Sequence, residues 1–300
     1  MAKSYKIPKP KDLLSAGVHF GHQSRRWNPK MEAYIFDQRK GIHIIDLEQT
    51  EKLLKAACDF LYDTAKSGGQ VIFVGTKRQA AEIITIEAKR CGALFVTERW
   101  LGGTLTNYKV VSQNIDGLVD FLRKRENDEF GHYTKKERLM IDRKIERLEK
   151  FVGGLIGLKS RPGALFVVDA RREKTAVREA LRMGVPVIAL IDTNSDPTGI
   201  EYIVPGNDDA IKSIAIVVKA LADAVFAGYK DMGKEADKKV KEEVEAAARA
   251  AQASEEVPAE LENVVQEVEV KTELKEIEVE GELKSKRGQV TEKAEVIVTE

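Results

Sequence analysis

The chain has 300 residues, which is enough for one large domain or two of ordinary size. Hydrophobic residues make up 43% of it and charged residues 33%, as in a globular protein with a strongly charged surface. No apolar run approaches the roughly 18 residues of a membrane span, and the basic amino terminus lacks the apolar core of a signal peptide. Only Cys58 and Cys91 are present, without CxxC spacing, which fits a reducing cytosol. Composition therefore excludes an integral membrane protein and a disulfide framework.

The net charge of zero conceals an uneven distribution. Residues 234–300 hold 11 Lys and Arg against 19 Asp and Glu, a balance of −8, so the rest of the chain carries +8. The first 40 residues alone have nine basic and three acidic side chains. A basic body favours polyanionic partners, and a charged surface kept for solubility is the alternative.

Short apolar runs alternate with helical patterns along the body. The runs at 71–75, 93–96, 164–170 and 185–192 do not alternate with polar residues, which predicts parallel strands covered on both faces. Segments 33–36 and 41–46 predict a small antiparallel hairpin. Between the runs we expect four helices. The first begins after an N-cap at Asp46 and stops at Gly68, and the others span 79–90, 173–182 and 208–227, the last of them ending at Gly228. The alternation predicts an α/β fold with a doubly wound, flavodoxin-like parallel sheet.

Residues 107–151 interrupt this alternation with two amphipathic stretches. Apolar residues recur at 4-3-4 spacing over 111–122 and again over 141–152, which indicates two heptad seams. Thr134 and Glu137 have the spacing of a capping box at the start of the second stretch. We therefore expect an antiparallel coiled-coil helical hairpin, with basic exposed faces, inserted into the sheet domain.

The sequence thus divides into three parts. Residues 1–106 and 152–233 are expected to form a discontinuous α/β body that binds RNA, and residues 107–151 the inserted hairpin. Residues 234–300 form an acidic tail with no aromatic residue and little apolar mass. Such a composition predicts a disordered or loosely helical tail.

The motifs of nucleotide-dependent enzymes and nucleophilic hydrolases are missing. Gly75-Thr76-Lys77-Arg78 follows a predicted strand and opens a helix, so its amides and two cations could hold a phosphate. It is not a Walker loop, and no GxGxxG or GxSxG follows any strand. The sequence therefore predicts no catalytic residue, no required cofactor and no enzyme. Two alternatives stay open: a nucleotide- or phosphate-binding enzyme of the doubly wound class, and a coiled-coil adaptor without an RNA role.

Three side chains are candidates for holding a structural divalent cation. His19 belongs to an HxxH segment, Asp192 follows a predicted strand, and Asp208 opens the next helix. Loops at strand ends converge on one edge of an open sheet, so these groups could meet there. The alternative is that the histidines are hydrogen-bonded in loops and the carboxylates serve in turns and helix caps.

Two turn-rich segments combine cations, a tryptophan and small polar side chains, over residues 23–30 and 99–107. Cations neutralise phosphates, amides and hydroxyls bind phosphate or ribose, and arginine or tryptophan planes stack on bases. The second tryptophan, Trp100, could equally belong to the core. The candidates for RNA contact are Arg25, Arg26, Trp27, Lys30, Lys77, Arg78, Arg99, Asn107 and Lys109, with Trp27 as a stacking or wedge residue.

Three separated motifs occur in one order along the body: GVHFGHQSRRWNPKM at 17–31, RWLGGTLTN at 99–107, and the run from Ala164 to Pro197. In these motifs the chain resembles the bacterial small-ribosomal-subunit protein two family. The resemblance covers residues 5–228 and leaves out the tail. It implies a non-catalytic structural constituent of the small ribosomal subunit in translation, ribosome-bound in the cytoplasm. It further implies contact with small-subunit ribosomal RNA and neighbouring proteins, and recruitment of the large mRNA-binding ribosomal protein.

Overall fold

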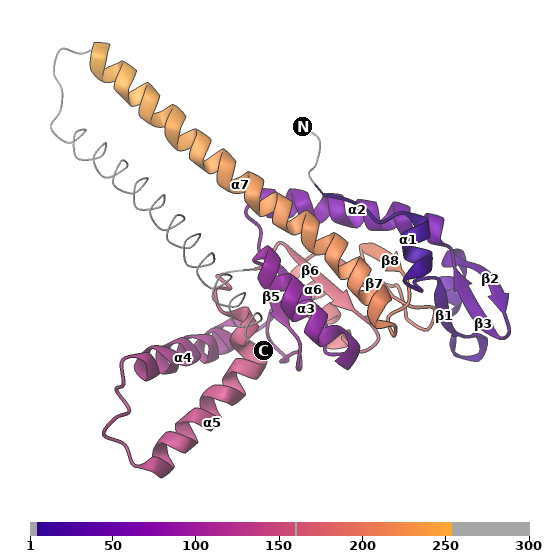
Figure 1. Ribbon diagram of the computed structural model, residues 1–300, viewed down its shortest axis with the longest axis horizontal. Coiled ribbons are helices and arrows are strands. Elements are labelled where there is room, and N and C mark those ends of the chain that lie inside the picture. The colour runs from indigo at the N-terminus through magenta and orange to yellow at the C-terminus, as the bar shows by residue number, and fades with distance from the viewer. Residues whose placement is uncertain (1–4, 160, 254–300) are drawn as a thin grey trace, which may run out of the picture. The chain divides into compact units, whose positions relative to one another are not determined.

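A computed structural model of the chain describes residues 5–159 and 161–253, with side chains described as far as residue 234. Its centre is a five-stranded sheet in which every neighbouring pair of strands is parallel (Figure 1). The order β5-β4-β6-β7-β8 is the flavodoxin-like doubly wound order, so the predicted fold class is confirmed. The strands are β4 (Val71–Val74), β5 (Leu94–Val96), β6 (Ala164–Val168), β7 (Val187–Ile191) and β8 (Tyr202–Pro205).

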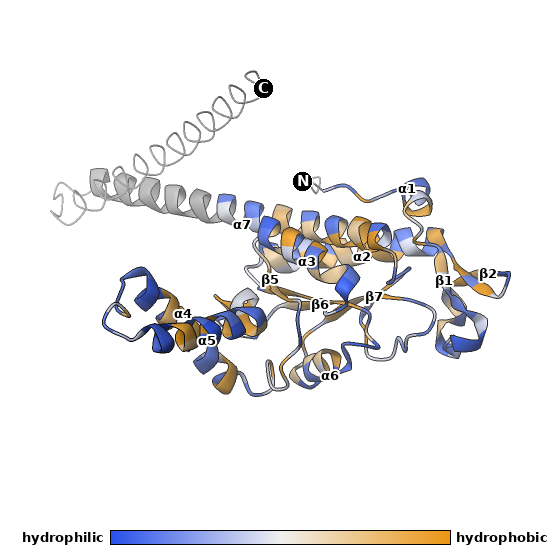
Figure 2. Ribbon diagram, turned by 60° about the horizontal axis from the view of Figure 1, so that its bottom comes forward, coloured by the Kyte–Doolittle hydropathy of each residue, from blue (hydrophilic) through white to orange (hydrophobic). Residues whose placement is uncertain are grey.

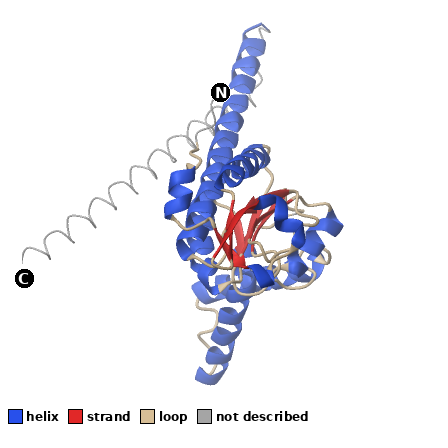
Figure 3. Cartoon of the chain, turned by 90° about the vertical axis from the view of Figure 1, so that its right-hand side faces the viewer, coloured by secondary structure: helices blue, strands red, loops and turns tan. Residues whose placement is uncertain are grey.

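Helices cover both faces of this sheet, as Figures 2 and 3 show. One face packs against α2 (Leu47–Lys66), α3 (Arg78–Cys91) and α7 (Ile211–Ala253). The other face packs against α6 (Lys174–Met183) and apolar residues of the inserted hairpin. Successive strand residues point to opposite faces, so double burial explains why the strands are apolar throughout.

Local signals in the sequence set most helix ends. The Asp46 carboxylate accepts hydrogen bonds from the backbone of Glu48 and Gln49, which caps α2. Gly92 and Gly184 end α3 and α6 in the left-handed conformation, with φ of 76° and 61°. These boundaries agree with the predicted ones.

The predicted helix end at Gly228 is wrong, because α7 continues through this glycine to Ala253. A Cβ at position 228 would lie 2.6 Å from the Tyr62 carbonyl oxygen and 2.7 Å from the Ala65 Cβ. The glycine therefore serves the close approach of α7 to α2 rather than a C-cap. A glycine inside a helix costs only about 1 kcal/mol, which this packing offsets. Of the predicted tail, residues 254–300 lie outside the described residues.

A second, antiparallel sheet lies near the amino terminus in the order β1-β3-β2. The predicted hairpin of β2 (Ile35–Arg39) and β3 (Ile42–Ile45) is confirmed, whereas β1 (Phe20–Gln23) and β8 were not predicted. The remaining short elements here are α1 (Pro10–Ser15) and the 3-10 turns η1 (Ser24–Arg26) and η2 (Pro29–Tyr34).

The predicted helical insertion consists of α4 (Tyr108–Glu126) and α5 (Lys135–Val152), followed by η3 (Gly153–Leu155). Thr134 and Glu137 exchange the two hydrogen bonds of a capping box. The two helices contact each other through their seams, with Ile115 and Ile145 buried. Among the described helices, none offers the uninterrupted apolar length that a membrane span requires.

The hairpin seam gives a direct stability test. Ile145→Ala removes a fully buried side chain and should lower the free energy of unfolding by about 2–5 kcal/mol. Leu139→Ala on the same helix is the control, because Leu139 is 50% exposed and should cost less than about 0.5 kcal/mol. Chemical unfolding followed by circular dichroism measures both. Equal effects of the two substitutions would contradict the packing of the seam.

Candidate nucleic-acid interface

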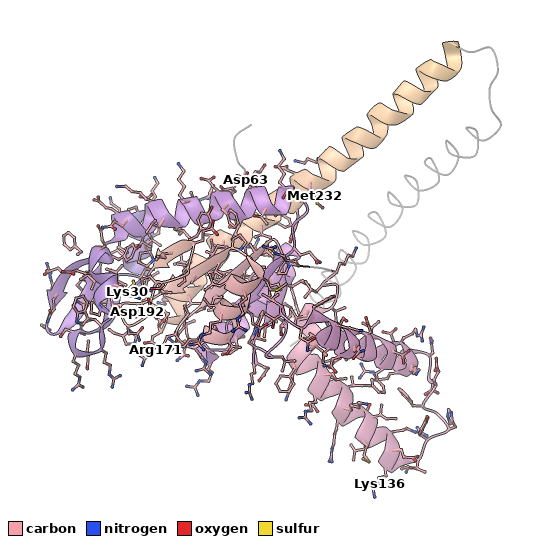
Figure 4. The ribbon with its side chains drawn as sticks, turned by 180° about the vertical axis from the view of Figure 1, so that it is seen from behind. Lys30, Asp63, Lys136, Arg171, Asp192 and Met232 are labelled. Atoms are coloured by element: carbon pink, nitrogen blue, oxygen red, sulfur yellow. The ribbon has the colours of Figure 1, made fainter. Side chains whose placement is uncertain are left out.

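The carboxyl ends of the parallel strands gather five loops at one edge of the sheet. We call this the carboxyl-end edge; it comprises residues 75–78, 97–100, 169–178, 192–200 and 206–209, together with residues 22–30. The last segment is held there by hydrogen bonds from the His22 and Asn28 backbone amides to Thr193, at 2.9 and 2.8 Å. Figure 4 shows Lys30, Asp192 and Arg171 close together at this end of the sheet. The strand-end rule thus brings distant parts of the sequence to one surface.

Lys77 lies inside a group of carboxylates on this edge. Its Nζ is 2.8 Å from Oδ1 of Asp208, 2.5 Å from Oδ1 of Asp209 and 3.9 Å from Oδ2 of Asp169. Burial raises the pKa of Asp208 to about 7. The negative charge of Asp169 raises this pKa further, whereas the hydrogen bond and charge of Lys77 lower it. Burial alone would lower the pKa of Lys77, but its bonds to Asp208 and Asp209 raise it. The ammonium group is therefore engaged within the protein.

Beside this group, His22 links two further carboxylates. Its Nδ1 is 2.7 Å from Asp192 Oδ2 and its Nε2 is 3.5 Å from Asp209 Oδ2. The hydrogen bond to Asp192 raises the pKa of His22 despite partial burial. Potential ligand atoms of His22, Asp192 and Asp209 lie within 4.8 Å of one another. One imidazole with carboxylates is a suitable ligand set for a divalent cation, and a carboxylate on the other ring nitrogen is the usual way to orient a metal-binding histidine.

The cation candidates from the sequence are only partly brought together. Asp192 and Asp208 are both 1% exposed at the carboxyl-end edge, and Oδ2 of Asp208 is buried without a hydrogen-bond partner. His19 instead packs against Phe20, with ring centroids 4.0 Å apart and the ring planes tilted by 40°, and burial lowers the pKa of His19. The histidine that reaches Asp192 is His22, which lies in β1, three residues after His19.

The crevice between β4 and β6, where doubly wound folds place their ligands, is filled by the protein's own side chains. The Thr76 amide donates to Oε1 of Glu173 at 3.1 Å, and the Thr76 hydroxyl bonds to the same carboxylate. Arg172 Nε donates to the Thr76 hydroxyl at 2.9 Å. Thr76 and Lys77 are therefore engaged within the protein, whereas Arg78 of the same segment is exposed and has no side-chain partner among the described residues.

The loop after β5 folds around one buried carboxylate. Glu179 of α6 accepts hydrogen bonds from the indole of Trp100 at 3.2 Å and from the amides of Gly103, Leu105 and Thr106 at 2.8–3.3 Å. Burial alone would raise the pKa of Glu179, but these donors outweigh it and lower the pKa. Trp100 is therefore a core residue, and these loop amides are not available to a phosphate.

Most of the predicted RNA-contact residues are nevertheless exposed. Asn107 and Lys109 lie away from the carboxyl-end edge, because the hydroxyl of the intervening Tyr108 bonds to the Leu158 carbonyl, which precedes β6. Trp27 is half-buried, with its ring 5.3 Å from that of His43. Lys30 and Lys77 are engaged: Lys30 Nζ lies 3.1 Å from Asp196 Oδ1 and also bonds to Thr198. The others are exposed, and apart from a bond from Arg25 to Gln23 their side chains have no hydrogen-bond or ion-pair partner among the described residues; they are Arg25, Arg26, Arg78, Arg99, Asn107 and Lys109.

Several residues that shape this edge were missed by the sequence reasoning. Glu179 gave no signal, because a glutamate inside an amphipathic helix is usually solvated. Asp209 follows Asp208 directly, so only the geometry could show which carboxylate meets His22. Arg171 and Lys174 do carry a signal, since they follow the end of a buried strand as Asp192 does.

Comparison with known proteins agrees with the resemblance seen in the motifs. The sequence model of the family described as Ribosomal protein S2 matches residues 13–228. "Small ribosomal subunit protein uS2" of Sorangium cellulosum (strain So ce56) is 50% identical over 74% of this chain and 80% of its own length. The protein of the same name from Geotalea uraniireducens (strain Rf4) is 46% identical over 86% of this chain and 96% of its own length. The one from Petrotoga mobilis (strain DSM 10674 / SJ95) is 50% identical over 73% of this chain and 76% of its own length.

The family match covers the sheet, the carboxyl-end edge and the helical insertion, and it confirms the family that the three motifs indicated. The family consists of structural ribosomal proteins, so the match also confirms the expectation that the chain is not an enzyme. The chain belongs to the ribosomal protein S2 family, a family of structural ribosomal proteins.

Proposed function

We propose that the protein is a structural constituent of the small ribosomal subunit, bound to the ribosome in the cytoplasm, and that its carboxyl-end edge binds small-subunit ribosomal RNA. The observation that carries this proposal is the set of exposed cations without internal partners on segments that meet at the carboxyl-end edge. Three of them are Arg26, Arg78 and Arg99. A basic surface without counterions of its own attracts phosphates.

The mechanism is recognition of folded RNA by its backbone and shape. Cations spread over several loops can contact phosphates that are far apart in the RNA sequence but close in its fold, and such contacts carry no sequence information. The exposed Asn107 side chain, which makes no capping bond to α4, adds donors for phosphate or ribose. Trp27 presents a partly exposed aromatic ring next to Arg25 and Arg26, where a base can stack.

The salt dependence of RNA binding tests this interface. The triple substitution of Arg26, Arg78 and Arg99 by alanine should lower the slope of log affinity against log salt by about 2–3, because each lost phosphate contact removes about 0.7–0.9. Binding of the full chain to transcribed small-subunit RNA, followed over a salt series, gives this slope. The fold should survive, since exposed cations contribute little to stability.

A matched control carries the same charge change away from the edge. Lys52 and Lys55 on α2 and Lys219 on α7 are exposed and form no ion pair among the described residues. Their triple alanine variant should keep the wild-type slope. Equal slopes for the two triple variants would contradict RNA binding through the carboxyl-end edge, and loss of co-sedimentation of the wild-type protein with small subunits would contradict the ribosomal role.

We also propose that His22, Asp192 and Asp209 hold a structural divalent cation, in place of the set with His19 expected from the sequence. Three carboxylates (Asp169, Asp208 and Asp209) surround the Lys77 ammonium, Asp192 lies beside them on His22, and Oδ2 of the buried Asp208 has no partner. A bound cation would supply the missing positive charge and tie the segment 22–30 to the loop after β7. It would act on structure and not as a reacting group.

Zinc titration of chelator-treated protein tests the cation site. One Zn²⁺ per chain should bind and raise the unfolding temperature, because a ligand that binds only the folded state stabilises it. His22→Ala should lose both effects, whereas His132→Ala in the exposed turn of the hairpin should keep them. Absence of stoichiometric binding, also with Mg²⁺, or its survival in His22→Ala, would overturn the site.

Recruitment of the large mRNA-binding ribosomal protein is the finer part of the proposed function. The antiparallel sheet exposes Phe36 at 73%, with Phe20 and Ile42 also exposed, and such side chains on a surface mark a contact with another protein. Phe36→Ala should lower the amount of that protein on small subunits that contain this chain. Phe226→Ala on α7, an exposed phenylalanine away from the sheet, is the control. Unchanged recruitment by Phe36→Ala would remove this surface from the proposal.

A further inference from the structure

Beside the cations expected from the sequence, the carboxyl-end edge contains a basic groove along α6. We call it the α6 groove. One wall is formed by the loop after β6 and the first turns of α6, and the other by segments near residues 28 and 194–198. Its charged and polar lining comprises Arg171, Lys174 and Arg178 on the first wall and Asn28, Asn194, Asp196 and Thr198 on the second, around a cavity of about 330 Å³.

The cations of the groove are free. Arg171, Lys174 and Arg178 are exposed, and none has an ion pair or side-chain hydrogen bond within the described part of the chain. The single carboxylate of the lining, Asp196, is already held by Lys30 at 3.1 Å and by Thr198, so it does not offset them. The two glutamates of this region point elsewhere: Glu173 bonds to Thr76, and Glu179 holds the loop after β5.

The cations on α6 form a row that the helix itself does not favour. Lys174, Arg178 and Arg182 follow each other at four-residue spacing, so they lie on one face with a rise of about 6 Å between neighbours. Like charges at this spacing destabilise a helix by a few tenths of a kcal/mol per pair. The rise is close to the spacing of successive phosphates along one nucleic-acid strand. A row of anions at that spacing would relieve the repulsion.

The opposite wall offers hydrogen-bond donors. Asn28 uses its side-chain oxygen to accept from the Lys30 amide at 3.0 Å, and Asn194 uses its oxygen to accept from Ser195 at 3.1 Å. Both side-chain NH₂ groups are left without a partner among the described residues. The lining therefore presents cations and amide donors together, which suits phosphate and ribose oxygens.

From these observations we infer that the α6 groove binds one strand of RNA, with its phosphates along Lys174 and Arg178 in the groove and on to Arg182, one turn beyond the lining, and its sugar edge toward Asn28 and Asn194. This inference rests on the proposed RNA-binding function and adds the α6 wall, which lies outside the basic motifs of residues 23–30 and 99–107; of the groove's polar lining, Asn28 alone belongs to one of these motifs. An acidic protein segment is the competing occupant. The regular row of cations and the pair of amide donors favour RNA.

The test uses the full chain and transcribed small-subunit RNA. Replacing Lys174, Arg178 and Arg182 together by alanine should lower the slope of log affinity against log salt by about 2. If the variant and wild type bind equally at 1 M salt, the variant should then bind about 100-fold more weakly at 0.1 M salt. The control is again the Lys52, Lys55 and Lys219 triple variant, which has the same charge. Circular dichroism of both variants checks that the fold is kept. If the triple variant is unstable, the double variant Arg178→Ala with Arg182→Ala replaces it in the binding measurement.

The outcomes separate this inference from the function on which it rests. If wild-type protein shows no salt-dependent binding to the RNA, the proposed function fails and the inference with it. If wild-type protein binds but the α6 variant keeps the control's slope, only the inference is overturned. Competition identifies the occupant: short oligouridine should displace the RNA from wild-type protein better than polyglutamate of equal charge, and the reverse order would overturn binding of an RNA strand in the groove.

Discussion

Replacing Glu179 with alanine is expected to lower the free energy of unfolding by about 3–5 kcal/mol, among the largest effects of any single substitution in this chain. The carboxylate is 7% exposed and accepts hydrogen bonds from the Trp100 indole and from three backbone amides of the same loop. Its removal leaves these donors without a partner inside the protein, and each unpaired buried donor costs about 1–3 kcal/mol.

The effect of Glu179→Ala should depend on pH in one direction. The hydrogen bonds place the pKa of Glu179 in the folded protein below its ordinary value of 4.5, against the opposing effect of burial. Its contribution to stability is therefore fully present above about pH 4.5 and is lost as the pH falls through the folded-state pKa. The difference in unfolding free energy between wild type and variant should shrink in acid.

Urea unfolding at several pH values, followed by tryptophan fluorescence, measures both effects. Arg182→Ala on the exposed side of the same helix is the control and should change stability by less than about 0.5 kcal/mol. A Glu179→Ala protein as stable as this control would show that the loop after β5 does not depend on the carboxylate.

The second large effect is expected for Lys77→Ala, with a loss of about 3–5 kcal/mol. Lys77 is 12% exposed and is the cation nearest to the buried Asp208, so its removal leaves an uncompensated charge in the sheet edge. Asp208 can respond by keeping its proton, which makes the loss smaller at low pH. Because Lys77 lowers the pKa of Asp208, that pKa lies above about 7 in the variant, so the stability of the variant should go on falling above pH 7, where the contribution of Asp208 in wild type levels off.

Arg78→Ala is the matched control for Lys77→Ala, because the two residues are adjacent but Arg78 is exposed and has no partner among the described residues. Thermal unfolding in the presence of a chelator should separate them by several kcal/mol, while RNA binding should weaken for Arg78→Ala. The opposite pattern, a stable Lys77→Ala protein with weakened RNA binding, would assign Lys77 to the phosphate contact expected from the sequence.

The fold could be predicted from the sequence wherever a local signal and the tertiary structure agree. Asp46, Gly92 and Gly184 act through their own backbone environment, so the ends of α2, α3 and α6 could be predicted. Gly228 looks the same in the sequence, but its role is set by α2, which is more than 160 residues away in the chain. A contact of that kind has no local signature.

The candidate site shows the same division. Exposed cations in turn-rich segments could be identified from their neighbours in the sequence, and Arg25, Arg26 and Arg99 are indeed exposed. Whether a cation is free depends on which carboxylates the fold brings near it. Lys77 is engaged by Asp208 and Asp209 across 131 residues, and no spacing rule could have shown this.

The central claim, that the carboxyl-end edge faces ribosomal RNA, is tested most directly by ultraviolet cross-linking of small subunits assembled with this chain. Mass spectrometry of the RNA-linked peptides reports which residues touch RNA. We expect the cross-links to lie in residues 25–30, 78, 99–109 and 171–182. Cross-links confined to the outer faces of α2 and α7, with none at the carboxyl-end edge, would contradict the account.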